Sequence, residues 1–237
     1  AALVGLFPDV LTAEKRFSRG FSSLPNYMFS KSIDDSSANK STGQTRNHPF
    51  NQRFDKGPSD FDHTHVFTSS SVWEIPSGFE SRVAKFALGG WSLTSIVAIQ
   101  SGFPFTVGSG VDNARTGTGG QRADLVGNPF LPGGRSRGEQ VLQWLDRAAF
   151  VTNPLGTFGN QGRNMFRGPG LTAVDLGVHK NFRVTEHLTT QFRFEVFNTF
   201  NHVNLAGPDA NRNSGNFMRT SGAYDPRILQ LALRLEW

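Results

Sequence analysis

The chain of 237 residues contains no cysteine, which excludes a disulfide framework and thiolate metal ligands. It also has no run near the roughly 20 apolar residues that a transmembrane helix requires. The net charge of +5 is scattered along the sequence, whereas a nucleic-acid-binding protein would need a contiguous basic surface. The first residues, AALVGLFPDV, lack an initial Met and the basic region of a signal peptide. We therefore expect a processed chain or a piece of a longer one, with no nucleic-acid partner.

What is abundant favours β structure, because the sequence holds 22 Phe, 4 Trp and 26 Gly. The final segment, ILQLALRLEW, alternates with the period of a strand. One of its faces is apolar, and the opposite face carries Arg234 and Glu236. A strand of a soluble sandwich fits this pattern, and so does a barrel strand with leucines in lipid and charges in a wet lumen. The residues of the apolar face are Leu229, Leu231, Leu233, Leu235 and Trp237.

Similar alternation predicts strands along the rest of the chain, and the facing of the third is the least certain because of Val66 and Val72. The predicted strands cover residues 10–17, 21–33, 61–75, 91–101, 171–182, 188–200 and 226–237. Three long polar loops separate them, at 34–60, 102–170 and 201–225, and Glu139 to Phe150 predicts a short helix within the second. Short connections alternate with long ones, as in outer-membrane barrels. A loop of roughly 70 residues would be unusual in a compact soluble domain.

Aromatic residues recur on the apolar faces near the short connections, where a membrane interface selects for them. Lys15, Lys31 and Lys180 are the charges on these faces, and each is near enough to a strand end to snorkel. This pattern favours an all-β, antiparallel transmembrane barrel over a soluble sandwich. Seven strands left open in lipid would expose unpaired backbone at both edges, so we expect part of a larger barrel. The predicted aromatic girdle is Phe17, Phe21, Trp73, Trp91, Phe182 and Trp237.

Several segments together resemble the TonB-dependent outer-membrane receptors, particularly the Oar-like group with a carboxypeptidase-regulatory-like N-terminal domain. The resemblance implies a barrel of about 22 strands around a plug domain, of which this chain would be the C-terminal part. The plug, the TonB box and the regulatory-like domain of that family are missing from this chain. The resembling segments are EKRFSRGFS (14–22), FSKSIDD (29–35), GGWSLTSIVAIQSGFPFTV (89–107), GTFGNQGRNMFRGPG (156–170), FRFEVFNTFNHVN (192–204) and DPRILQLALRLEW (225–237).

The resemblance implies a function in nutrient uptake across the outer membrane of a Gram-negative bacterium, powered through TonB. It implies as partners membrane lipid, lipopolysaccharide, the TonB complex, a nutrient ligand of unknown identity and the barrel-assembly machinery. That machinery would read the terminal strand, with Leu229, Leu231, Leu233, Leu235 and Trp237 as the signal. Two alternatives stay open: a surface or adhesion barrel without transport, and a soluble β-rich binding module.

The arginines of the second long loop are candidate ligand-binding residues, because guanidinium groups form forked hydrogen bonds with anions and sugars. The alternative is that they meet lipopolysaccharide phosphates or pair with nearby Asp112, Asp124, Glu139 and Asp146. The candidates are Arg115, Arg122, Arg135, Arg137, Arg163 and Arg167.

Metal binding and catalysis find little support in the sequence. His63 and His65 share one face of a predicted strand, with His48 as a distant third ligand, but hydrated histidines at a barrel rim explain them better. Ser, His and Asp are all present, yet no nucleophile elbow appears. We therefore expect no catalytic residues, no metal and no cofactor.

Overall fold

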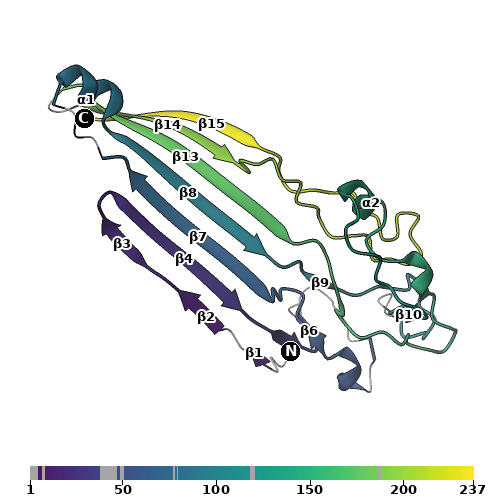
Figure 1. Ribbon diagram of the computed structural model, residues 1–237. Helices are drawn as coiled ribbons and strands as arrows, with labels where there is room; N and C mark the ends of the chain where they lie inside the picture. The colour runs from purple at the N-terminus through teal and green to yellow at the C-terminus, as the bar shows by residue number, and fades with distance from the viewer. Residues whose placement is uncertain are drawn as a thin grey trace.

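A computed structural model describes residues 5–6, 9–37, 47–48, 51–76, 78, 80–117, 121–185 and 188–237 of the chain. One large antiparallel sheet dominates it, and the strands follow the order β15-β14-β13-β8-β7-β4-β2, with β3 also paired to β4 (Figure 1). This confirms the all-β, antiparallel class. The strands are β2 (Asp9–Thr12), β3 (Lys15–Ser18), β4 (Phe21–Phe29), β7 (His65–Glu74), β8 (Trp91–Gln100), β13 (Leu171–Arg183), β14 (Thr189–Phe197) and β15 (Ile228–Glu236).

Each of the seven predicted strand regions contains a strand of this sheet, and two of them are divided. The first region becomes β2 and β3, which pair with successive parts of β4. The second is wrong beyond Phe29, because Ser32–Asp34 leaves the large sheet as β5 and pairs with β1 (Gly5–Leu6) and β6 (Gly57–Pro58). The sheet ends at β15 on one side and at β2 and β3 on the other, so it is an open wall.

The strand register sorts the side chains onto two faces, since residues directly opposite each other in an antiparallel pair point the same way. One row across the wall is almost entirely apolar, and we call this side the apolar face. The adjacent row lies on the opposite side, the polar face, and contains charged residues. The apolar row is Leu231, Phe194, Val178, Leu93, Trp73 and Phe21, and the polar row is Ala232, Arg193, His179, Ser92 and Glu74.

The register also settles the facing of β7. Phe67 lies opposite Ile99, and Trp73 lies opposite Leu93, so both aromatic residues belong to the apolar face. Val66 and Val72 are therefore on the polar face. The alternation in β7 was hard to interpret because apolar residues occur on both of its sides.

A β-bulge in β3 overturns the expected position of Phe17. Lys15 lies opposite Ser23 but Ser18 lies opposite Phe21, so one extra residue is inserted between them. Phe17 consequently leaves the apolar face and borders a shallow cleft together with Ser22 and Val72 of the polar face. A strict period of two cannot anticipate such an insertion.

The two ends of the wall differ, as Figure 1 shows. At one end, the turn end, Arg19 and Gly20 form a tight turn with φ values of 52° and 78°, and a short turn joins β13 to β14. The β7–β8 connection also lies there and contains the helix α1 (Arg82–Leu88), which the sequence did not predict. The three long loops meet at the opposite end, and their described residues form what we call the loop cap.

The loop cap is built from short elements rather than from structureless chain. They are β5, β6 and η2 (Gln52–Asp55) from the first loop, and β9 (Pro104–Phe105), β10 (Asp124–Leu125), α2 (Arg137–Leu142), η3 (Arg147–Ala149), β11 (Phe150–Val151) and β12 (Phe166–Arg167) from the second. Strands β9 and β12 pair with each other, and so do β10 and β11. The prediction of long irregular loops was therefore too simple.

The helix predicted from Glu139 to Phe150 is shorter and begins earlier. Ser136 caps α2 in a capping box with Glu139, which fixes its start. The helix ends at Leu142 because the next residues take other partners: the Trp144 amide donates to the Met218 carbonyl at 2.8 Å. Asp146 then caps the separate helix η3.

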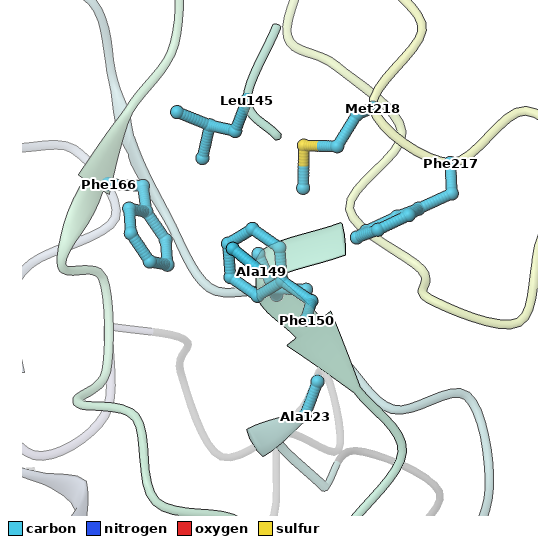
Figure 2. Packing of buried hydrophobic residues seen from close by; sticks show 8 residues of the cluster. Ala123, Leu145, Ala149, Phe150, Phe166, Phe217 and Met218 are labelled. Atoms are coloured by element: carbon cyan, nitrogen blue, oxygen red, sulfur yellow. The ribbon is translucent and has the colours of Figure 1, made fainter. Parts of the chain in front are cut away.

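The principal cluster of buried apolar residues lies in the loop cap and not against the wall. Figure 2 shows Phe150 at its centre, between Phe166 on one side and Phe217 on the other. The ring centroid of Phe150 lies 5.3 Å from that of Phe166 and 5.9 Å from that of Phe217, and both pairs meet edge-on. The second and third long loops thus share one core. The cluster consists of Val107, Ala123, Leu145, Ala149, Phe150, Phe166, Phe217 and Met218.

Candidate functional site

The apolar face of the wall is the first candidate functional surface. On β15, Leu231 and Leu233 leave 67% and 65% of their surface exposed, and Leu229 and Leu235 are exposed as well. They continue onto β14, where Leu233 lies opposite Phe192 and Leu231 opposite Phe194. Such a contiguous apolar surface is unfavourable in water and suits contact with lipid. The five predicted insertion residues, with Trp237 at the end of the strand, lie along this side of the chain's last strand.

Aromatic residues of the predicted girdle gather where this face reaches the turn end. Phe21 and Trp73 are directly paired, and Trp91 and Phe182 both lie near the ammonium of Lys180, at 5.2 Å and 5.1 Å from its nitrogen to their ring centroids. Lys180 is buried and donates a hydrogen bond to the Gly89 carbonyl. The charge of Lys180 on the apolar face thus has a hydrogen-bond partner within the chain. Phe17 is the predicted girdle residue that the bulge in β3 moves away from this face.

The polar face carries groups that need water or one another. Arg193 lies opposite His179 and Ala232, and Glu195 follows on the same side. The His179 ring nitrogen Nε2 is 3.5 Å from the Glu195 carboxylate. This face suits a hydrated lumen, where polar and charged side chains alternate with the lipid-facing residues.

The loop cap is the second candidate surface, and buried ion pairs hold its base together. Arg122 and Asp55 are almost completely buried, and the Arg122 guanidinium nitrogen lies 2.6 Å from the Asp55 carboxylate. The guanidinium also packs over the Phe54 ring at 4.3 Å and donates to the Phe54 carbonyl. Burial lowers the pKa of Arg122, and the charge of Asp55 partly offsets that effect. This pair joins the first long loop to the second.

Two more arginines make the same connection. Arg163 contacts the carboxylates of Asp34 at 2.5 Å and Asp60 at 3.1 Å, and Arg167 pairs with Asp62. Burial by itself would raise the pKa of Asp34, but hydrogen bonds from Arg163, Ser59 and Ser37 outweigh it and lower that pKa. In total, three of the six candidate arginines are engaged with aspartates of the connection between β4 and β7.

Of the nearby carboxylates that the sequence suggested, Glu139 has its pKa lowered by hydrogen bonds from Ser136 and also by the charge of Arg135. The buried ion pairs use other carboxylates. Asp112 instead accepts hydrogen bonds from its own turn, including the backbone of Gly117, and those bonds lower its pKa against the opposing effect of desolvation. Glu139 caps α2, and Asp124 accepts from the Asn160 backbone at 2.8 Å. Sequence proximity was a poor guide, since the real partners flank strands that are neighbours in the sheet. Four aspartates were missed as arginine partners: Asp34, Asp55, Asp60 and Asp62.

The other three candidate arginines lie elsewhere in the cap. Arg115 occupies a turn with φ of 54°. Arg137 contacts the His202 ring at 3.0 Å. Arg135 donates to the carbonyls of Gln143 and Trp144 at 2.6 Å and 3.1 Å.

Arg135 and Arg167 border a cleft of about 430 Å³ in the cap, so the structure brings two of the six candidates to one site. Its walls combine large apolar side chains with glycines: Phe130, Leu131, Gly133, Gly134, Trp144 and Met165. An apolar floor with a few placed donors is the usual composition of a small-ligand site. A guanidinium beside an indole ring suits a ligand that has oxygen acceptors and a flat or apolar surface.

The histidines considered for metal binding have separate partners. The His63 Nδ1 atom lies 2.6 Å from the Ser101 carbonyl, and the His65 Nδ1 atom lies 2.8 Å from the Tyr27 hydroxyl. His48 packs on the Phe158 ring at 4.3 Å. Among the described residues, no cluster of three or more His, Asp or Glu has the geometry to hold a metal ion.

The open antiparallel wall, with one apolar and one polar face and with elaborated loops at one end, has the architecture of a transmembrane β-barrel. A model of the outer membrane beta barrel domain matches residues 10–230, nearly the whole chain. The chain therefore belongs to this family of outer-membrane barrel proteins, and its location is the outer membrane. Neither the curated proteins nor the solved structures yielded a significant match. In the described part of the chain, every helix is too short or too polar to span a bilayer.

Proposed function

We propose that this chain forms the C-terminal part of a TonB-dependent outer-membrane transporter of the Oar-like group in a Gram-negative bacterium. The observation that carries the proposal is the folded loop cap, with its cleft, on an open wall. A wall whose edge strands end unpaired in lipid is unfavourable, so further strands complete the barrel. The polar face then lines a lumen wide enough for the plug of a large transporter.

In this function the loop cap captures the ligand at the cell surface. The plug then rearranges under force relayed by TonB, and the ligand passes along the polar face of the wall. The cleft at Trp144 and Arg135 is the proposed contact site for a nutrient with acceptor oxygens, such as a glycan or an anionic chelate. Arg115 and Arg137, which are exposed and outside the buried ion pairs, bind ligand or lipopolysaccharide phosphates at the cap surface.

Membrane assembly requires a second set of partners. The leucines of β15 and Trp237 present an apolar, exposed strand, which we propose is read by the barrel-assembly machinery. The TonB complex contacts regions of the protein outside this chain. The proposed chemistry is binding and transport, without catalysis, cofactor or nucleic acid.

The test is growth or uptake in a strain that produces the whole protein, compared with strains lacking the protein or lacking TonB. Candidate glycans, chelates, peptides and vitamins serve as the limiting nutrient. Transport predicts that both deletions abolish uptake of the same nutrient. A surface barrel without transport predicts unchanged uptake and lost attachment of cells to a surface, and that result would overturn the proposal.

Binding at the cleft is tested separately with Trp144→Ala, at a partly buried position. The control is Phe200→Ala, which removes an exposed aromatic side chain outside the cleft. We expect Trp144→Ala to lower apparent affinity by about tenfold or more, since a buried aromatic contact contributes at least 1.4 kcal/mol. Phe200→Ala should leave affinity unchanged. Equal effects of the two changes would contradict the assignment of the cleft.

A further inference from the structure

Helix α1 is a feature that neither the barrel class nor transport explains. It has seven residues, RVAKFAL, and stands at the turn end of the wall (Figure 1). Val83, Phe86 and Leu88 are 77%, 61% and 55% exposed, although they are large apolar side chains. A helix this short is marginal in water unless an apolar surface packs against it. Its own chain supplies only part of that surface.

Three contacts hold α1 against the apolar face rather than over the lumen. The Phe86 ring packs on the Phe182 ring, with centroids 5.4 Å apart. The Trp91 indole nitrogen donates to the Ala87 carbonyl at 3.1 Å. The Lys180 ammonium donates to the carbonyl of Gly89, the residue that caps the helix C-terminus.

All three wall residues belong to the apolar face, since Lys180 lies opposite both Trp91 and Phe192 in the register and Phe182 follows on the same side. A cation at a helix C-terminus also stabilises the helix dipole. The helix is thus a continuation of the lipid-contacting surface at its turn-end border. Gly90 makes the turn from the helix into β8 possible, with φ of 72° and the Asn181 carbonyl 2.7 Å from where a Cβ would stand.

The charges of this region match a lipid headgroup layer. Lys85 lies on α1 and is exposed. Short amphipathic helices with basic residues and exposed Phe, Val or Leu lie at the boundary between headgroups and acyl chains. Basic residues near an anionic surface strengthen such binding.

We propose that α1 is an interfacial membrane anchor whose occupant is the phospholipid leaflet at the turn end of the barrel. Val83 and Phe86, which are three positions apart and so share one side of the helix, enter the upper acyl region, and Lys85 meets the phosphates. Lys180 fixes the helix to the wall through the Gly89 carbonyl, so the anchor is rigid and not a flexible tether. The proposal rests on the outer-membrane barrel class and not on transport, so either can fail without the other.

This sequence contributes no cysteine of its own, so any cysteine elsewhere in the protein is replaced by serine before single-cysteine labelling. The protein at its native length, carrying Val83→Cys with a bimane label, is reconstituted in phosphatidylethanolamine–phosphatidylglycerol vesicles that contain an acyl-chain nitroxide lipid. Leu231→Cys on the apolar face is the lipid-facing reference, and Leu155→Cys is the control. Leu155 is an exposed apolar residue like Val83, but it belongs to the loop cap.

We expect nitroxide lipid to quench the label at residue 83 to about half or more of the extent seen at residue 231, and the label at residue 155 hardly at all. Quenching at residue 83 that equals the low value at residue 155, with strong quenching at 231, would overturn the proposal. Measurements use only protein with the heat-modifiable migration of a folded barrel, so misfolded variants do not enter the comparison.

A second variant tests the clamp. Lys180→Gln, which weakens the contact to the Gly89 carbonyl, should reduce quenching at residue 83 and increase the mobility of a spin label there. The label at residue 231 should be unaffected. Unchanged quenching and mobility at residue 83 would contradict the role of Lys180.

Discussion

The wall exposes its large apolar side chains, whereas the loop cap buries a cluster of them. On the wall, leucines such as Leu231 face outward and are largely exposed, while in the cap Phe150 and Val107 are wholly buried. The hydrophobic effect acts only where water is the alternative environment. Lipid replaces water around the wall, so its apolar side chains need no protein partner there. The cap projects into water and must build its own core.

The two regions also differ in where they place charged side chains. The cap buries Arg122 with Asp55 in one pair, whereas the wall places Arg193 and Glu195 on its polar face. A buried pair is costly to break because the remaining charge has no compensation. The cap therefore depends on specific partners, and the wall depends on which face a residue occupies.

The largest effect is expected from Phe150→Ala, which empties the centre of the cap core. We expect a loss of about 3–5 kcal/mol in cap stability, detected as faster proteolysis of the loops in intact membranes. The matched change on the wall, Leu231→Ala, should cost far less, because lipid fills the space. Equal protease sensitivity of the two variants would remove the contrast between the regions.

Breaking the buried ion pair should have an effect of similar size. Arg122→Ala leaves the Asp55 carboxylate uncompensated and should cost about 3–5 kcal/mol in the same assay. The double variant Arg122→Met with Asp55→Leu should recover most of that loss, since neither charge remains. If the double variant is as unstable as the single one, the pair is not what holds the two loops together.

On the wall, the cost of adding a charged side chain depends on the face to which it is added. Leu231→Arg puts a cation on the apolar face and should lower the unfolding free energy by about 2–4 kcal/mol in lipid. Gln230→Arg, one residue earlier on the polar face, should change it little. Chemical unfolding in vesicles measures both. Similar losses would show that the two faces do not differ in environment, and a larger loss for Gln230→Arg would show that the faces are assigned the wrong way round.

A smaller effect is expected at the end of β15. Trp237→Ala should lower the amount of folded protein in the outer membrane several-fold, because the terminal aromatic of the proposed insertion signal is lost. Immunoblots of membrane fractions measure it, with Phe200→Ala in the cap as the control. Normal levels of the Trp237 variant would exclude this residue from the signal.

The smallest effect is a pH dependence confined to the cap. The pKa of Asp34 lies below its ordinary value of 3.8, so its ion pair with Arg163 stabilises the fold fully above that value. Stability is lost as the pH falls from about 4 through the lowered pKa. Proteolysis of the cap by an acid-active protease should accelerate over this window, and Asp34→Asn should flatten the dependence. An unaltered pH profile in that variant would assign the acid sensitivity to other groups.

Periodic features were accessible from the sequence because alternation in strands such as β15 and β14 follows directly from strand geometry. The aromatic residues at Trp73 and Trp91 could be assigned to one end for the same reason. The bulge before Ser18 could not, since a single inserted residue leaves no compositional mark. The helix α1 lies in a connection too short for a helical period to stand out.

The candidate site was predicted only in part. The arginine-rich loop was recognised, but which arginines remain for a ligand depends on aspartates far away in the sequence. Arg163 and Asp34 are separated by 129 positions, and only the order of strands in the sheet brings them together. Pairings of that kind follow from topology and are invisible to local patterns.

The long sequence separation of these ion pairs sets an order of events during folding. Arg122 and Asp55 are 67 positions apart, and Arg167 and Asp62 are 105 apart, so each pair closes a large loop of chain. Closing such loops is entropically expensive until neighbouring strands have already brought the ends together. We therefore expect strands β4, β7, β8 and β13 to align before the cap closes. A cap that closes only after the wall is complete stays flexible while the strands insert, and it gains its buried ion pairs last.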